Sequence, residues 1–391
     1  MSLSACHKEK AETPNPFFEE WTTPYGVPPF DRIRPEHFLP AFERGMSLHN
    51  AEIDAIVSAS DEPTFENTIA AYDAAGRMLQ RTALIFEMLT ASDATPQMQA
   101  VEEEAMPLLA AHADEIRMNE RLFERIEAVY NRRAALPLTA EQLRLTEKLY
   151  RQFVRSGALL DEAGKRRLKE INGELSRLSV KYGNNVLSEN DTFRLELTVD
   201  QLEGLPNAVR EAAREKAREL ELGDKYYVFT LHKPSMLPFL SYSKNRKLRE
   251  QLYTAYLDRC NNDDEYDNKG LVNDYIRLRT EKAHLLGYDS YADYVIADQM
   301  AATPAAVYTL LDEIWTPALD RAKEELAAME GLLRADEPEA TFEPWDWWYY
   351  AEKVRRRDYA LDDEMLRPYF TLENVQGGIF FLANRLYGIT F

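Results

Sequence analysis

The chain has 391 residues, of which 45% are hydrophobic and 29% are charged, so it is long and apolar enough to build a substantial folded core. Its formal net charge at pH 7 is -20. Affinity for nucleic acid depends on clustered lysine and arginine, so this charge argues against nucleic acid as a partner. A basic peptide would be attracted, although acidity of this kind also simply keeps a protein soluble.

The first residues carry a short motif around a cysteine. Leu3-Ser4-Ala5-Cys6 matches a bacterial lipobox, in which a small residue precedes a cysteine that becomes lipid-modified. Residues 7–16 are polar and are expected to form a disordered tether. No apolar signal segment precedes Cys6, so either the match is accidental or the signal was trimmed for expression and a short tag added. We expect Cys6 to be a lipid attachment site, which places the protein in the cell envelope, facing the periplasm. The alternative is a cytoplasmic protein without an anchor.

From Pro35 onward the hydrophobic spacing is helical almost throughout. Thr64 is predicted to cap one helix whose apolar spacing continues to Phe86, with Asn67 at the third position. Thr95, Asn119 and Thr139 are predicted to cap the next three helices, the last through a capping-box variant. A long helix is expected over 161–186.

Only two segments have strand character. Residues 193–199 alternate apolar and polar side chains, and residues 226–231 form a second short strand. Pro234 and Pro238 are predicted to end that strand in a turn. Further helices are expected over 245–259, 268–286, 290–299, 303–333, 346–359 and 372–386. The predicted fold class is therefore all-α, a mainly helical body over residues 17–391 with a small β insert.

The sequence contains no self-sufficient catalytic site. No two of the six histidines lie three or four residues apart, and no His-Glu-x-x-His is present, so no helix offers a histidine pair to one metal ion. There is no Gly-x-Ser-x-Gly and no glycine-rich phosphate loop. Cys260 reads as a structural thiol, and two cysteines form no disulfide framework. Gly377-Gly378 lies in a helical pattern, where glycine more often permits close helix packing than ligand approach.

An aromatic helix near the end of the chain is the strongest binding candidate. On the predicted helix over 346–355, Tyr349 and Tyr350 share a face with the cation Lys353. Aromatic stripes are usually core, and that reading stays open here. Two phenols and a cation on one face also suit a groove that binds an extended peptide. We therefore predict Tyr349 and Tyr350 as residues that line a substrate channel.

The ordered run of short motifs resembles the N-terminal half of the M3 zinc oligopeptidases. The resemblance covers the chain from about Asn15 to Phe391, and within the family it is strongest to bacterial peptidyl-dipeptidases (dipeptidyl carboxypeptidases). Each motif alone is weak, and their order and spread make the resemblance specific. The motifs are Asn15-Pro16-Phe17, Gly26-Val27-Pro28-Pro29-Phe30-Asp31, Pro63-Thr64-Phe65-Glu66-Asn67-Thr68, Ser156-Gly157-Ala158, Lys233-Pro234-Ser235, Asn245-Arg246-x-x-Arg249, Leu285-Leu286-Gly287-Tyr288, Asp346-Trp347-x-x-Tyr350 and Leu386-Tyr387-Gly388-Ile389.

The resemblance implies a helical body around a deep channel that admits short unfolded peptides. It implies one zinc ion, held by a His-Glu-x-x-His helix and a downstream glutamate, with the motif's glutamate activating water. These residues are absent from the sequence, so no catalytic or metal-binding residue is carried over. We expect residues 17–391 to form one wall of the channel.

The aromatic-rich end of the chain favours a longer protein, with the zinc-binding catalytic domain following Phe391 as the partner of this region. The expected activity of that protein is release of C-terminal dipeptides, and this chain alone is expected to be inactive. The alternatives are an oligopeptidase A-like endopeptidase or a non-catalytic helical peptide-binding adaptor lipoprotein.

Overall fold

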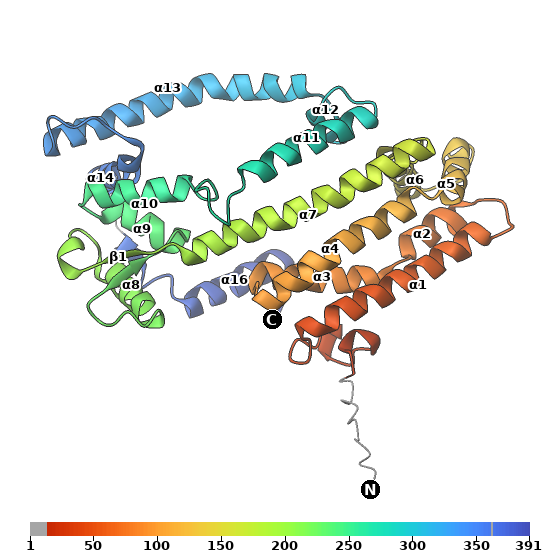
Figure 1. Ribbon diagram of the computed structural model, residues 1–391, viewed down its shortest axis with the longest axis horizontal. Coiled ribbons are helices and arrows are strands. Elements are labelled where there is room, and N and C mark those ends of the chain that lie inside the picture. The colour runs from red at the N-terminus through yellow and green to blue at the C-terminus, as the bar shows by residue number, and fades with distance from the viewer. Residues whose placement is uncertain (1–13, 361–362) are drawn as a thin grey trace, which may run out of the picture. The chain divides into compact units, whose positions relative to one another are not determined.

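The computed structural model describes residues 14–360 and 363–391 (Figure 1). Within these ranges it is mainly helical, with one two-stranded sheet, which confirms the predicted fold class. Cys6 lies outside the described residues, so its lipidation stays a prediction. None of the described helices combines the length and the apolar character that crossing a membrane requires. The chain divides into two compact units, the first of residues 1–185 and 267–304 and the second of residues 186–266 and 305–391.

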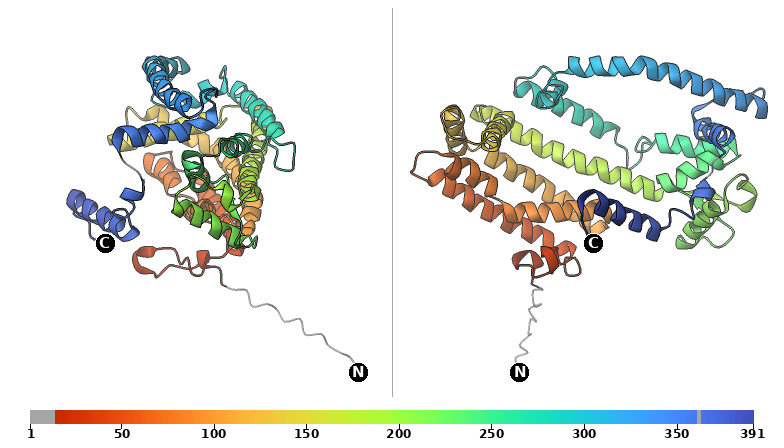
Figure 2. Two further views of the ribbon diagram at one scale, coloured as in Figure 1. Left: turned by 90° about the vertical axis from the view of Figure 1, so that its left-hand side faces the viewer. Right: turned by 180° about the vertical axis from the view of Figure 1, so that it is seen from behind.

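The first unit is a set of packed helices. The predicted caps are confirmed, because the side chains of Thr95, Asn119 and Thr139 each accept a hydrogen bond from a backbone N–H in the first turn of their helix. Helices α1, α3 and α4 run side by side (Figures 1 and 2). The helices of this unit are α1 (Phe38–Ser58), α2 (Ala71–Ala74), α3 (Arg77–Ser92), α4 (Pro96–Arg117), α5 (Glu120–Arg132), α6 (Ala140–Arg155), most of α7 (Glu162–Thr192), α11 (Lys269–Leu285) and α12 (Tyr291–Ile296).

The predicted single helix from Thr64 to Phe86 is wrong. A π-helical turn over Phe65–Ala70 leads into the short α2, and the chain then breaks at Gly76 before α3 begins. Gly76 has φ +73°, which favours glycine, and a Cβ there would lie 3.1 Å from Nδ1 of His49. Its backbone N–H donates to Glu52 at 2.6 Å. The hydrophobic spacing continues across the break, so periodicity alone did not reveal it.

Two buried clusters form the core of the first unit. One gathers the ends of α1, α3 and α4 with the N-terminal segment, around Phe17, Phe38, Phe42 and Phe86. The aromatic rings of Phe38 and Phe86 meet edge to face with centroids 5.0 Å apart. The other cluster joins the far part of α1 to α5 and α6. The unit therefore buries an apolar core of its own.

The second unit combines the small sheet with the remaining helices. Strand β1 (Leu195–Leu197) pairs antiparallel with β2 (Tyr227–Phe229), with Leu195 opposite Phe229, so both strands lie where predicted but are shorter. Helix α8, which was not predicted from the sequence, contacts β2. The helices are α8 (Asn207–Glu219), α9 (Lys233–Tyr242), α10 (Arg246–Leu257), α13 (Pro304–Asp336), α14 (Trp347–Tyr359), α15 (Asp363–Leu366) and α16 (Leu372–Tyr387).

The predicted turn at Pro234 and Pro238 is also wrong, because both residues lie in α9. Pro234 occupies the first turn, where a backbone N–H has no partner within the helix and its absence costs nothing. Pro238 lies within the helix and removes one hydrogen bond. Burial of Met236, Phe239 and Leu240 in the core of the second unit compensates for that loss.

Candidate functional site

Two sequence motifs that lie about a hundred residues apart meet around one buried carboxylate in the second unit. The side chain of Asp346 is 0% exposed and accepts hydrogen bonds from Arg246 (Nη2, 2.6 Å) and Arg249 (Nη2, 2.8 Å). Its Oδ2 also accepts from the backbone N–H of Glu343 at 3.0 Å. This ion-pair cluster of Asp346, Arg246 and Arg249 fixes the start of α14 against α10.

The electrostatics of this cluster favour the ionised carboxylate. Burial by itself would raise the pKa of Asp346, but the hydrogen bonds from Arg246 and Arg249 outweigh it and hold the pKa below its ordinary value. Arg249 is itself almost fully buried and also donates to the backbone carbonyl of Ser243 at 2.8 Å. Each charge in the cluster therefore depends on the others to offset its loss of solvation.

The ring of Tyr349 packs against this ion-pair cluster. The guanidinium carbon of Arg249 lies 4.2 Å from the centroid of the Tyr349 ring, at cation–π distance. Lys353 approaches the same ring, with its Nζ 5.4 Å from the centroid. Tyr349 is half-buried, so part of its side chain remains accessible while the rest packs against Tyr350 and its neighbours. Through Arg249, the buried Asp346 holds Tyr349 in a defined position.

Tyr350 has a different environment. It is 1% exposed and packs in a small cluster with Met329, Leu333 and Phe342. Burial, together with the neighbouring Asp336 carboxylate, raises the pKa of its phenol well above the ordinary value. Tyr350 therefore offers no surface to a peptide in this structure, and of the predicted pair only Tyr349 stays a candidate for substrate contact.

Tyr349 lines a groove in the second unit with a volume of about 350 Å³. Gly204 is required at its wall, because it has φ +90° and a Cβ there would lie 2.3 Å from the carbonyl oxygen of Tyr242. Phenol, ammonium and guanidinium donors in one groove suit the carbonyl and carboxylate oxygens of a peptide. The lining residues are Gly204, Ser241, Tyr242, Lys244, Tyr349, Glu352, Lys353 and Arg356.

In the first unit the structure brings together two histidines whose pairing the sequence spacing did not predict. Nδ1 of His49 on α1 lies 3.0 Å from Nε2 of His112 on α4, at hydrogen-bond distance. Burial lowers the pKa of both rings, so the pair is held neutral more strongly than free histidine. Among the described residues, no group of three or more histidine, cysteine, aspartate and glutamate side chains could hold a metal ion.

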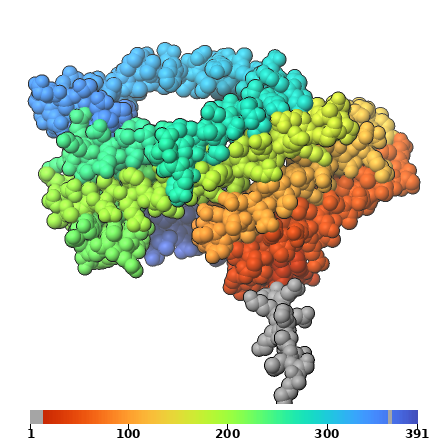
Figure 3. Space-filling view, in the orientation of Figure 1, coloured from red at the N-terminus to blue at the C-terminus, as the bar shows by residue number. Residues whose placement is uncertain are grey.

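Two helices of the second unit expose broad apolar surfaces. On α13, Leu311, Ile314 and Trp315 are 51%, 55% and 65% exposed. Figure 3 shows this helix in light blue. On α16, apolar side chains are exposed around the whole helix. A Cβ added at Gly377 or Gly378 would meet no described atom of another element within 4 Å, so the predicted close packing finds no partner there. Helices that are apolar on most sides are normally covered by other protein. The exposed apolar residues of α16 are Leu372, Val375, Ile379, Phe380, Phe381, Leu382, Leu386 and Tyr387.

Comparison with known proteins relates this chain to peptidases. Residues 239–391 match the family model of Peptidase family M3. Dipeptidyl carboxypeptidase of Escherichia coli (strain K12) is 37% identical over 381 residues, which is 97% of this chain and 56% of that protein. The corresponding protein of Salmonella typhimurium is 36% identical over 96% of this chain and 56% of its own length. Oligopeptidase A of Escherichia coli (strain K12) is 30% identical over 94% of this chain and 55% of that protein. The chain thus spans about half the length of the curated relatives it matches.

Proposed function

This chain is a homologue of the M3 peptidases, and on that premise we propose that it is the N-terminal part of a zinc-dependent peptidyl-dipeptidase that removes dipeptides from the C-termini of short, unfolded peptides. The observation that carries the proposal is the similarity to Dipeptidyl carboxypeptidase along nearly the whole chain, at higher identity than to Oligopeptidase A. That second relationship makes an endopeptidase the alternative. Cys6 remains our proposed lipid anchor in the cell envelope, which palmitate labelling of the full-length protein and its Cys6→Ser variant tests.

The described residues of this chain do not fit a catalytic zinc ion, since they include no suitable group of ligands. In the proposed enzyme the metal is bound by residues beyond this chain, where it would act as a Lewis acid and activate water. The role that we assign to this chain is to form one wall of the peptide channel, with the Tyr349 groove facing the substrate. The exposed apolar surfaces of α13 and α16 support a further protein region packed against them.

The activity is tested with the protein encoded by the complete gene. We expect it to shorten unstructured peptides by two residues at a time from the C-terminus, as mass spectrometry of the products would show. A zinc chelator should abolish cleavage, and added zinc should restore it. Fragments from internal cleavage would favour the endopeptidase. Absence of any cleavage would refute both.

Tyr349→Phe in the full-length enzyme is expected to lower kcat/KM by roughly 2- to 12-fold, which corresponds to one lost hydrogen bond of about 0.5–1.5 kcal/mol. Thermal stability should change little, because the Tyr349 side chain is only half-buried. Tyr350→Phe is the matched control on the same helix. Its hydroxyl is buried near Asp336, so it should cost about 1 kcal/mol of stability and leave kcat/KM nearly unchanged. An unchanged kcat/KM in Tyr349→Phe would remove Tyr349 from the substrate channel.

A further inference from the structure

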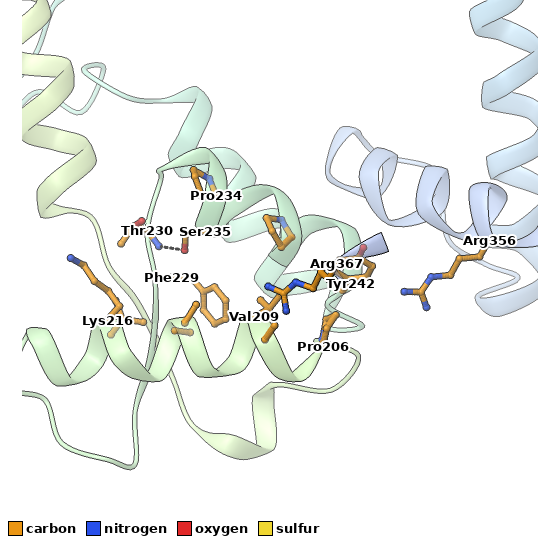
Figure 4. A pocket seen from close by; sticks show the side chains of 15 residues that line it. Pro206, Val209, Lys216, Phe229, Thr230, Pro234, Ser235, Tyr242, Arg356 and Arg367 are labelled. Atoms are coloured by element: carbon orange, nitrogen blue, oxygen red, sulfur yellow. Dashed lines mark hydrogen bonds between the residues drawn. The ribbon is translucent and has the colours of Figure 1, made fainter. Parts of the chain in front are cut away.

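A second pocket of the second unit lies against α8 and α9, with a volume of about 400 Å³ (Figure 4). Its floor is apolar and rests on the small sheet, since Phe229 of β2 is 1% exposed and belongs to the core. Ser235 of α9 accepts a hydrogen bond from the backbone N–H of Thr230 at 3.0 Å, which ties the helix to the end of the strand. The apolar lining residues are Pro206, Ala208, Val209, Ala212, Ala213, Val228, Phe229, Pro234 and Pro238.

The charged residues at this pocket are all cations. Lys216, Arg356 and Arg367 line it, and its described lining includes no carboxylate. This is unusual in a chain with a net charge of -20. The pocket shares Tyr242 and Arg356 with the Tyr349 groove, so the two cavities are adjacent at these residues.

Arg356 has the position of a binding residue. Its side chain is 50% exposed and extends from α14 toward the pocket (Figure 4). Its Nε donates to Glu352 at 2.7 Å, and its guanidinium carbon lies 5.2 Å from the centroid of the Tyr242 ring. Glu352 and Tyr242 therefore orient the guanidinium at the junction of the two pockets. A planar guanidinium held in this way can donate two parallel hydrogen bonds to a carboxylate.

We propose that this pocket binds the C-terminal residue of a peptide, with an apolar side chain on the floor formed by α8, β2 and α9 and the terminal carboxylate at Arg356. The apolar floor supplies the area that favours burial of such a side chain, and the cationic rim supplies the charge complementarity. The choice of a peptide over another apolar carboxylate rests on the proposed function.

The test measures binding to the 391-residue chain, without any catalytic step. N-acetyl-Ala-Ala-Phe is titrated as the free acid and as the C-terminal amide, and isothermal titration calorimetry gives both affinities. We expect the free acid to bind at least about tenfold more tightly than the amide, as loss of a charge-assisted hydrogen-bond pair implies. Arg356→Gln should bring the two affinities to within about twofold of each other. Arg357→Gln, the next residue of α14, whose Nε pairs with Asp358 outside the pocket, should keep the difference.

Three outcomes would overturn the proposal. They are equal binding of acid and amide, absence of binding, and an Arg356→Gln variant that keeps the preference with unchanged circular dichroism. An amidated peptide that ends in glutamate distinguishes the terminal carboxylate from a side-chain carboxylate, and equal affinity for it would contradict the assignment to a C-terminus. Because no cleavage is measured, failure here leaves the proposed peptidase activity standing. Failure of that activity would likewise leave this binding result intact.

Discussion

Asp346→Ala is expected to destabilise the second unit by about 3–5 kcal/mol, the cost of leaving a buried charge without its partner. Arg249 is 1% exposed, and in the variant its guanidinium would keep only backbone carbonyl acceptors. Because Arg249 also supports the ring of Tyr349, the groove should lose its shape together with its stability. Urea denaturation of the wild type and the variant, followed by tryptophan fluorescence, measures the change.

The matched control replaces both members of the buried pair. Asp346→Leu combined with Arg249→Met removes the uncompensated charge, so it should recover a large part of the lost stability.

The pH dependence of stability follows from the Asp346 carboxyl group. Burial raises the pKa of Asp346, but the hydrogen bonds from the arginines lower it by more. The pKa in the folded state therefore lies below the pKa in the unfolded state. The contribution is complete above about pH 4 and is lost as the pH falls below it. A loss under about 1 kcal/mol for Asp346→Ala would contradict the role of this cluster.

Ile314→Ala is expected to change stability little in the 391-residue chain and much more in the full-length protein. In the 391-residue chain Ile314 is 55% exposed, and its truncation should change stability by no more than about 0.5 kcal/mol. In the full-length protein we expect α13 to be covered, and the same truncation should then cost about 2–5 kcal/mol. Denaturation midpoints of both forms, with and without the substitution, give the comparison.

Leu333→Ala on the same helix is the control for this comparison. Leu333 is 1% exposed and packs with Met329 and Tyr350 within this chain, so its truncation should cost about 2–5 kcal/mol in both forms. The shorter chain should also self-associate through its apolar helices, which sedimentation velocity would detect. A small effect of Ile314→Ala in the full-length protein would show that this face of α13 stays open there.

Local signals predicted most of the helices because the determinants are local. The side chains of Thr64, Thr95, Asn119 and Thr139 each bond within the turn that follows, so their role is visible within four residues of sequence. The break at Gly76 depends on Glu52 and on the ring of His49, which lie more than twenty residues away in sequence. Helix α9 was misread because two nearby prolines signal a turn, whereas Pro234 lies in the first turn, where proline is compatible with a helix, and burial in the core offsets the hydrogen bond lost at Pro238.

The site was predicted only in part, because several of its contacts join distant segments of the chain. The aromatic pattern identified the helix of Tyr349 and Tyr350. It could not separate the half-buried side chain from the buried one, since that depends on how closely each packs against Met329 and Leu333 of α13. Arg246 and Arg249 were noted only as part of a motif. Their pairing with Asp346 is a contact between distant segments, and no local periodicity encodes it. The apposition of His49 and His112 was missed on the same ground.

We propose that this chain forms the metal-free channel wall of a zinc peptidase. The most direct measurement is the zinc content, by inductively coupled plasma mass spectrometry, of the purified 391-residue chain and of the purified full-length protein. We predict about one zinc ion per molecule in the active full-length protein and none retained by the shorter chain, whose described residues include no suitable ligand group. Stoichiometric zinc in the shorter chain, or an active full-length protein without zinc, would contradict the claim.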